Sequence, residues 1–222
     1  MSSSTPLIEL RNIHLQYGER PILKGVSFAV NPGEFALLYG GTGTGKSSLC
    51  HLLAGLIMPS EGQVLLAGDD MTTFTTSQRR WIRRSMGLML QKHMLLEDRT
   101  ILQNVMLPAI VAGDGLREAR RRALQALTKC GIDDLAQSDP RALSAGQRQL
   151  ACLARAVVNR PVVIIAYEPL AQLDQTNAMT LLKLFSAFAQ AGVTIVMTSY
   201  RQSILAGIKE IPLAPFAVQE DI

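Results

Sequence analysis

Features typical of membrane-spanning, secreted or cysteine-ligated metal proteins are missing from this chain of 222 residues. It has no run of eighteen apolar residues, so we expect no membrane span. Its first residues, Met-Ser-Ser-Ser-Thr-Pro, contain no basic or apolar region, which predicts no secretory signal. Cys50, Cys130 and Cys152 are far apart and lack metal-ligand spacing. We expect them to be reduced core thiols of a cytosolic protein.

Strong charge is also absent. The net charge of +4 is compatible with an anionic ligand or a membrane surface, but it is too small to favour nucleic acid as a partner. Apolar residues make up 48% of the chain, so a packed core is expected and disorder is not. We find no internal repeat, low-complexity tract or long linker. The sequence therefore predicts one α/β domain, or such a domain with a small lobe.

A glycine-rich loop is the most informative feature of the sequence. Apolar residues 35–39 predict a buried strand before the loop, and residues 48–54 predict a helix after it. Such a loop aims backbone N–H groups and a helix dipole at one point, where an anion is favoured. Lys46 would then neutralise the β- and γ-phosphates of a nucleotide, and the Ser47 hydroxyl would bind Mg²⁺. The alternative is an ordinary glycine-rich turn, which the flanking strand and helix disfavour. The residues concerned are Gly40, Gly41, Thr42, Gly43, Thr44, Gly45, Lys46, Ser47 and Ser48.

Short strand patterns alternate with helical ones along most of the chain. The expected strands are 7–13, 22–30, 35–39, 63–67, 86–90, 162–166 and 194–198. Residues 95–159 are almost free of strand signals and predict a helical insertion. Within it, a helical stripe is formed by Leu116, Ala119, Ala123 and Leu127. The arginines opposite this stripe indicate a solvated face rather than a lipid or partner patch, because Glu118 precedes Arg122 by four residues.

A second set of motifs lies in the C-terminal half. Ser144 is placed to cap a helix that continues through Val157. Shortly afterwards, the buried run 162–166 leads to the carboxylate of Glu168. Together with the glycine loop, this ordered set resembles the nucleotide-binding subunits of ATP-binding cassette (ABC) systems over nearly the whole chain. The resemblance implies a mostly parallel core sheet, an antiparallel β subdomain and a helical subdomain.

The resemblance assigns roles to residues that no local pattern would single out. Tyr17 would stack on adenine, and Gln91 would contact both the metal and the attacking water. Glu168 would polarise that water, and Asp174 would lie at the dimer interface. The residues expected to grip the γ-phosphate bound to the opposite protomer are Ser144, Gly146 and Gln147. Glu168 and Gln91 are thus the expected catalytic residues, Ser47 and Gln91 the expected Mg²⁺ contacts, and ATP and Mg²⁺ the expected cofactors.

Within the family, the resemblance is greatest to the cell-division branch, of the FtsE type. It depends on residues 91–100, on Asn104 and Pro108, and on residues 154–161. It implies a four-span membrane partner of the FtsX type, a homodimer closed across ATP, and indirect coupling to periplasmic cell-wall hydrolases. A cytoplasmic protein held at the inner face of the membrane is expected. We expect a single domain over 1–222, with a core of about 1–91 and 160–222 and a helical subdomain of about 92–159.

Two positions depart from the family pattern at the expected metal and phosphate contacts. Tyr167 stands where the family has a Mg²⁺-binding aspartate, and Tyr200 where it has a histidine. A phenol with a pKa near ~10 is neutral at pH 7 and is a poor ligand for Mg²⁺. We therefore predict ATP binding with weakened Mg²⁺ binding and slow or absent turnover. Three further departures are Ala145, Leu150 and Leu170.

Three alternatives stay open at this point. The chain could be a working ATPase motor, or a nucleotide-binding scaffold without turnover that pairs with itself or with a more regular ATPase. It could also be the ATPase subunit of a lipoprotein-export type transporter. A tandem ABC protein acting on ribosomes or DNA is disfavoured, because only one cassette fits in 222 residues.

Overall fold

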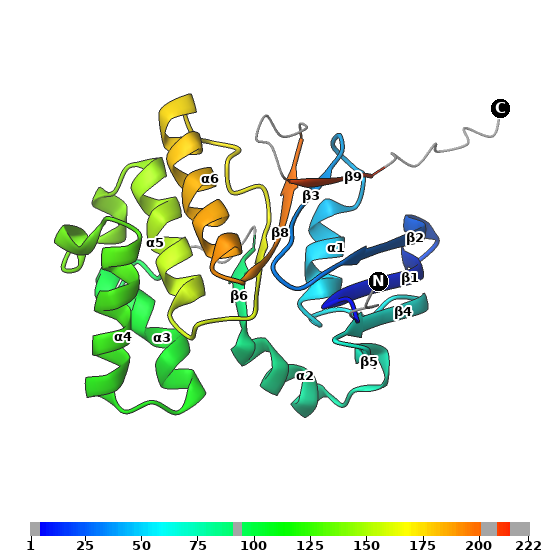
Figure 1. The fold of residues 1–222 in the computed structure, drawn as a ribbon, viewed down its shortest axis with the longest axis horizontal. Helices are drawn as coiled ribbons and strands as arrows, with labels where there is room; N and C mark the ends of the chain where they lie inside the picture. The colour runs from blue at the N-terminus through cyan, green and yellow to red at the C-terminus, as the bar shows by residue number, and fades with distance from the viewer. Residues whose placement is uncertain (1–4, 91–94, 201–207, 214–222) are drawn as a thin grey trace.

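A computed structural model describes residues 5–90, 95–200 and 208–213 (Figure 1). Its centre is a parallel sheet with strand order β6-β7-β8-β3-β9. The strands are β3 (Phe35–Tyr39), β6 (Met86–Met89), β7 (Val163–Ala166), β8 (Thr194–Ser199) and β9 (Lys209–Pro212). Residues of β3, β7 and β8 are almost entirely buried, as expected for parallel strands covered on both faces. All parallel strands end at one edge, and the glycine loop follows β3 at this edge.

An antiparallel sheet forms the second β-rich part, on the right of Figure 1. Its strand order is β2-β1-β4-β5, and its strands are β1 (Ile8–Tyr17), β2 (Arg20–Val30), β4 (Glu61–Leu66) and β5 (Asp69–Asp70). Along β1, Ile8, Leu10, Ile13 and Leu15 are buried. These side chains pack with α1 (Lys46–Leu53) in one apolar cluster, which fixes the antiparallel sheet against the helix that follows the glycine loop.

The remaining helices lie mostly on the other side of the molecule (Figure 1). They are α2 (Thr76–Ile82), α3 (Ile101–Ala112), α4 (Leu116–Lys129), α5 (Ala145–Val157) and α6 (Gln175–Gln190). Short 3₁₀ turns are η1 (Met71–Thr73), η2 (Arg83–Ser85), η3 (Asp133–Leu135) and η4 (Pro140–Ala142). Helices α3, α4 and α5 pack on one another, and α5 also packs on β6 and α6. The described residues contain no helix that is both long and apolar enough to cross a membrane.

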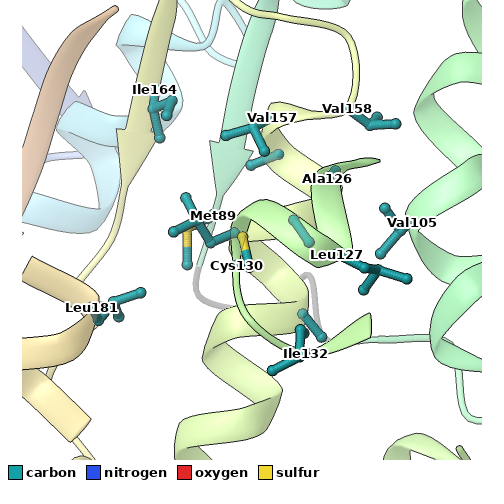
Figure 2. Packing of buried hydrophobic residues seen from close by; sticks show 14 of the residues in the cluster. Met89, Val105, Ala126, Leu127, Cys130, Ile132, Val157, Val158, Ile164 and Leu181 are labelled. Atoms are coloured by element: carbon teal, nitrogen blue, oxygen red, sulfur yellow. The ribbon is translucent and has the colours of Figure 1, made fainter. Parts of the chain in front are cut away.

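One apolar cluster joins the helical part to the parallel sheet. Figure 2 shows Val105 of α3, Leu127 of α4 and Val157 of α5 in the same packed region as Ile164 of β7 and Leu181 of α6. Burying one such aliphatic side chain contributes roughly 1.5–3 kcal/mol. Because the cluster is continuous, α5 is held in a defined position relative to β7, the strand that leads to Glu168.

The predicted fold class is confirmed, with several differences in detail. The first expected strand is longer and reaches Tyr17 as β1, and α1 begins at Lys46 rather than Ser48. Elements α2, β5 and β9 were not predicted. Leu116 is 70% exposed, so its predicted place on the buried stripe is wrong, whereas Ala119, Ala123 and Leu127 are buried. All three cysteines are free thiols, with Cys50 and Cys130 buried and Cys152 half-buried.

Candidate nucleotide-binding site

The glycine loop leaves the end of β3 in a conformation that requires glycine. Gly43 and Gly45 have φ of +83° and +81°, in the left-handed region. A Cβ on Gly45 would lie 2.6 Å from Leu23 Cδ2, and one on Gly40 would lie 2.7 Å from the carbonyl oxygen of Leu213. Gly41, Thr42 and Gly43 are exposed, whereas Thr44 is buried and its hydroxyl donates to the Gly41 carbonyl at 3.0 Å. The loop is therefore closely seated on both sheets, with its outer part facing solvent.

Lys46, the first residue of α1, is held inside this loop. Its side chain is 4% exposed, and Nζ donates to the carbonyl oxygens of Gly40 and Gly41 at 2.6 Å each. Nζ also lies 3.4 Å from Oε1 of Glu168. A buried ammonium with flexible partners is suited to binding an anion, since it can exchange carbonyl contacts for phosphate oxygens.

Glu168 lies just beyond the end of β7 in a strained backbone conformation. Its φ is +42°, and its N–H donates to Thr198 Oγ1 at 3.0 Å. The side chain is 6% exposed, and Oε1 is buried without a hydrogen-bond partner besides its ion pair with Lys46. A non-glycine residue in this region costs of order 1–3 kcal/mol and is commonly found at functional sites. Thr198 belongs to no motif in the sequence, so its role could be found only from the fold.

Two tyrosines surround this ion pair. The Lys46 ammonium lies 4.4 Å from the centre of the Tyr200 ring, in cation–π geometry. Burial and the neighbouring Glu168 carboxylate raise the pKa of Tyr167 to about 12. Hydrogen bonding to Glu168 likewise raises the pKa of Tyr200. Both phenols are therefore neutral near pH 7.

Two cavities border these residues. One, of about 550 Å³, lies beside α6 and is lined by Glu168, Ser199 and Tyr200. The other, of about 350 Å³, lies between α5 and β7 and is lined by Arg148, Tyr167, Glu168 and Tyr200. Glu168 is the only carboxylate among the described residues that line either cavity. The space around Glu168 is therefore accessible but contains few acidic groups.

Tyr17 stands on the other side of the glycine loop. It ends β1, is 53% exposed, and its hydroxyl lies 3.5 Å from Ser48 Oγ at the start of α1. The antiparallel sheet thus brings an exposed aromatic ring next to the loop, although 28 residues separate Tyr17 from Gly45 in the chain. This placement is compatible with stacking on a base whose phosphates lie at the loop.

The predicted signature segment is an exposed helix start. Ser144 Oγ accepts from the N–H of Gln147 at 3.2 Å, and Gln147 Oε1 accepts from the N–H of Ser144 at 2.9 Å. This capping box begins α5. A Cβ on Gly146 would lie 2.8 Å from Asn177 Oδ1, so glycine allows α6 to approach closely. Ser144, Gly146 and Gln147 line neither cavity, and Asp174 caps α6 by accepting from the N–H of Asn177 at 2.8 Å.

The described residues do not fit a carboxylate-ligated Mg²⁺ site. No group of three or more His, Cys, Asp or Glu side chains gathers anywhere in residues 5–90, 95–200 and 208–213. Tyr167 offers a neutral phenol, and Glu168 is paired with Lys46. Of the two predicted Mg²⁺ contacts, Ser47 offers only a hydroxyl, and Gln91 lies outside the described residues. Mg²⁺ prefers carboxylate oxygen and water, so this donor set is poor.

Residues 23–171 match the ABC transporter family, and the chain belongs to that family. It is thus an ABC-type ATP-binding protein of the ATP hydrolase class. The chain is 39% identical over 201 residues to the cell division ATP-binding protein FtsE of Escherichia coli, covering 90% of both proteins. It is 35% identical over 212 residues to the macrolide export ATP-binding/permease protein MacB of Nitrosomonas europaea, covering 93% of this chain and 32% of that protein.

Solved structures agree with this assignment. A bacterial ABC transporter cassette solved as a dimer matches with a TM-score of 0.84 and 30% identity, over 93% of this chain and 94% of that one. A second structure is a dimeric post-hydrolysis state of an ATP-binding cassette with bound ADP and phosphate. It matches with a TM-score of 0.80 and 29% identity, over 87% of this chain and 88% of that one.

Proposed function

We propose that this protein is the ATP-binding subunit of a cell-division ABC complex and that it turns ATP over slowly. The observation that carries the proposal is the formed phosphate loop, in which Lys46 is buried among carbonyl oxygens at 2.6 Å. Similarity to FtsE along 90% of both chains supports the cell-division role. The whole chain, 1–222, would act as one ATP-binding domain, with residues 92–159 as its helical subdomain.

ATP would lie along the glycine loop, with its phosphates on the loop amides and Lys46. Tyr17 would stack on adenine, because its exposed ring stands beside Ser48. Glu168 would orient the attacking water, aided by Gln91. The helix start at Ser144 is exposed, which supports a contact with ATP bound to a second protomer across a homodimer interface. Ser47 and Gln91 would supply what Mg²⁺ contact there is.

The partner would be an FtsX-like integral membrane protein, with the ATP-binding subunits held at the inner face of the membrane. Closure of the dimer across ATP would move that partner, which would act indirectly on periplasmic cell-wall hydrolases. No nucleic acid is involved.

Slow turnover follows from the two tyrosines. Phosphoryl transfer depends on charge neutralisation around the γ-phosphate and on the metal. Tyr167 supplies no charge, and Tyr200 covers Lys46 with a ring. Losing one electrostatic contact commonly lowers a rate by on the order of 10²–10³. The two effects need not multiply, because residues that act as a unit are not additive.

The same two residues favour a second candidate function, a nucleotide-binding scaffold without turnover. In that case bound ATP would set the geometry of the dimer, and ATP would leave the site by dissociation instead of being hydrolysed. A heterodimer with a more regular ATPase is a variant of this candidate.

Co-expression with the candidate FtsX-like protein tests the proposal. We expect the two proteins to co-purify from membranes, and ATP to convert the purified subunit from monomer to dimer in light scattering. Lys46→Ala should abolish the dimer without abolishing co-purification. Failure of the native proteins to co-purify would contradict the cell-division assignment. If ATP does not change the mass of the purified subunit in light scattering, closure of the homodimer across ATP would be contradicted.

A further inference from the structure

The polar centre of the site is a nearly neutral group of four side chains, in which the ion pair is buried and Tyr200 is exposed. Lys46 and Glu168 form an ion pair at 3.4 Å, with side chains only 4% and 6% exposed. The Tyr200 ring lies 4.4 Å from the Lys46 ammonium. Tyr167 and Tyr200 line the same cavity as Glu168. The one carboxylate of the group is therefore already paired with Lys46, and the two phenols beside it are uncharged.

A second carboxylate at position 167 would change the charge balance. A triphosphate entering such a site would meet two acidic groups and would need a divalent cation to screen the repulsion. Here Glu168 is the only carboxylate among the described residues bordering the two cavities, and Arg148 lines one of them. Metal-free ATP therefore meets a single negative charge, which is paired with Lys46.

The tyrosines also account for what happens to Glu168 when Lys46 turns to the phosphates. Oε1 would lose its ion pair and has no hydrogen-bond partner of its own. An uncompensated buried carboxylate is costly. Tyr167 and Tyr200 line the same cavity as Glu168, so their phenol groups are the neighbouring side chains that could donate to it. They would offset part of the stabilisation that the carboxylate loses.

We infer that this site binds ATP without needing Mg²⁺, with Tyr167 and Tyr200 in place of a Mg²⁺ ligand set. This inference rests on the proposed function, because it needs ATP to occupy the glycine loop. It differs from slow turnover, since it concerns the charge state of the ligand that is bound. The inference predicts that ATP⁴⁻ and MgATP²⁻ bind to the site about equally well.

The test is a calorimetric titration of the native, full-length protein with ATP, once with excess Mg²⁺ and once with EDTA. We expect the two dissociation constants to agree within about threefold, which is less than the tenfold change that one well-placed charge produces. Binding more than about threefold tighter with Mg²⁺ overturns the inference and leaves the proposed function standing. No binding under either condition overturns both.

Two variants at one position sharpen the test. Tyr167→Asp adds the missing carboxylate, so ATP binding in EDTA should weaken at least about tenfold, and Mg²⁺ should restore it. Tyr167→Phe removes the phenol O–H without adding a charge, so the ratio of the two constants should change far less than in Tyr167→Asp. A Tyr167→Asp protein whose ratio also stays near one would show that position 167 does not act on the phosphates and would overturn the inference. If Tyr167→Asp does not fold, the native titration alone decides.

Discussion

Replacing Gly45 or Gly43 by alanine separates backbone strain from lack of space in the phosphate loop. The two residues have nearly the same φ, +81° and +83°. A new Cβ at position 45 would lie 2.6 Å from Leu23 Cδ2 and 3.0 Å from the Ile22 carbonyl oxygen, whereas one at position 43 has nothing within 4 Å. The pair is therefore matched in conformation and differs in packing.

The magnitudes follow from these contacts. A left-handed alanine costs about 1–2 kcal/mol at either position. Forcing a methyl group into a filled space adds typically about 1–3 kcal/mol, and this applies to Gly45 alone. We expect Gly43→Ala to destabilise the nucleotide-free protein by about 1–2 kcal/mol and Gly45→Ala by about 2–5 kcal/mol.

Urea denaturation followed by far-UV circular dichroism measures both variants at the same m-value. Equal destabilisation would refute the packing argument, because only the shared backbone strain would then be acting. ATP titration provides a second comparison. Gly45→Ala should lose most of its affinity, since relief of the clash must displace either the loop or β2.

Three further predictions concern other parts of the structure. Lys46→Met leaves Glu168 buried and unpaired, so we expect it to destabilise the protein by about 3–5 kcal/mol. Adding Glu168→Gln should recover most of this loss in a double-mutant cycle, and an additive cycle would argue against the ion pair. Asn104→Ala should lower the free energy of unfolding, measured with denaturant, by about 2–4 kcal/mol. The reason is that the fully buried Asn104 amide accepts from the Leu96 N–H and donates to the Leu96 carbonyl. A change below about 0.5 kcal/mol would contradict this. Burial raises the pKa of the Cys50 thiol from 9.0 to about 12, so its stabilising effect is complete below pH 9 and is lost as pH rises toward 12. Relative to Cys50→Ser, the native protein should lose about 1.4 kcal/mol per pH unit above pH 9, and parallel pH profiles would contradict this.

The elements that could be predicted are those that contain buried apolar runs or are bounded by glycine-containing loops. Strands β3 and β7 are short apolar runs and β8 has an apolar centre, and the loop after β3 has a motif that fixes its position. Helix α2 was not predicted because it buries no residue, so no hydrophobic period marks it. Strand β5 is only Asp69–Asp70, and β9 has a single isoleucine, so both depend on pairing with a neighbour rather than on their own composition.

Site residues divide in the same way. The glycine loop with Lys46 could be found from spacing alone, because the chemistry is local. Tyr17, Glu168 and the signature segment were assigned by resemblance, and the structure brings Tyr17 and Glu168 to the loop from distant parts of the chain. The contact between Lys46 and the Tyr200 ring could not be predicted, since no local pattern joins residues so far apart. Leu116 was misplaced because it lies in the first turn of α4, where no other element covers it.

The central claim is that ATP is held by the glycine loop in surroundings that are poor at cleaving it. Steady-state phosphate release by the complex purified with its membrane partner tests this most directly, with the double variant Tyr167→Asp, Tyr200→His measured beside it. We expect the native complex to release phosphate on the order of 10²-fold more slowly than the double variant. A native rate equal to that of the double variant, and abolished by Glu168→Gln, would contradict the claim.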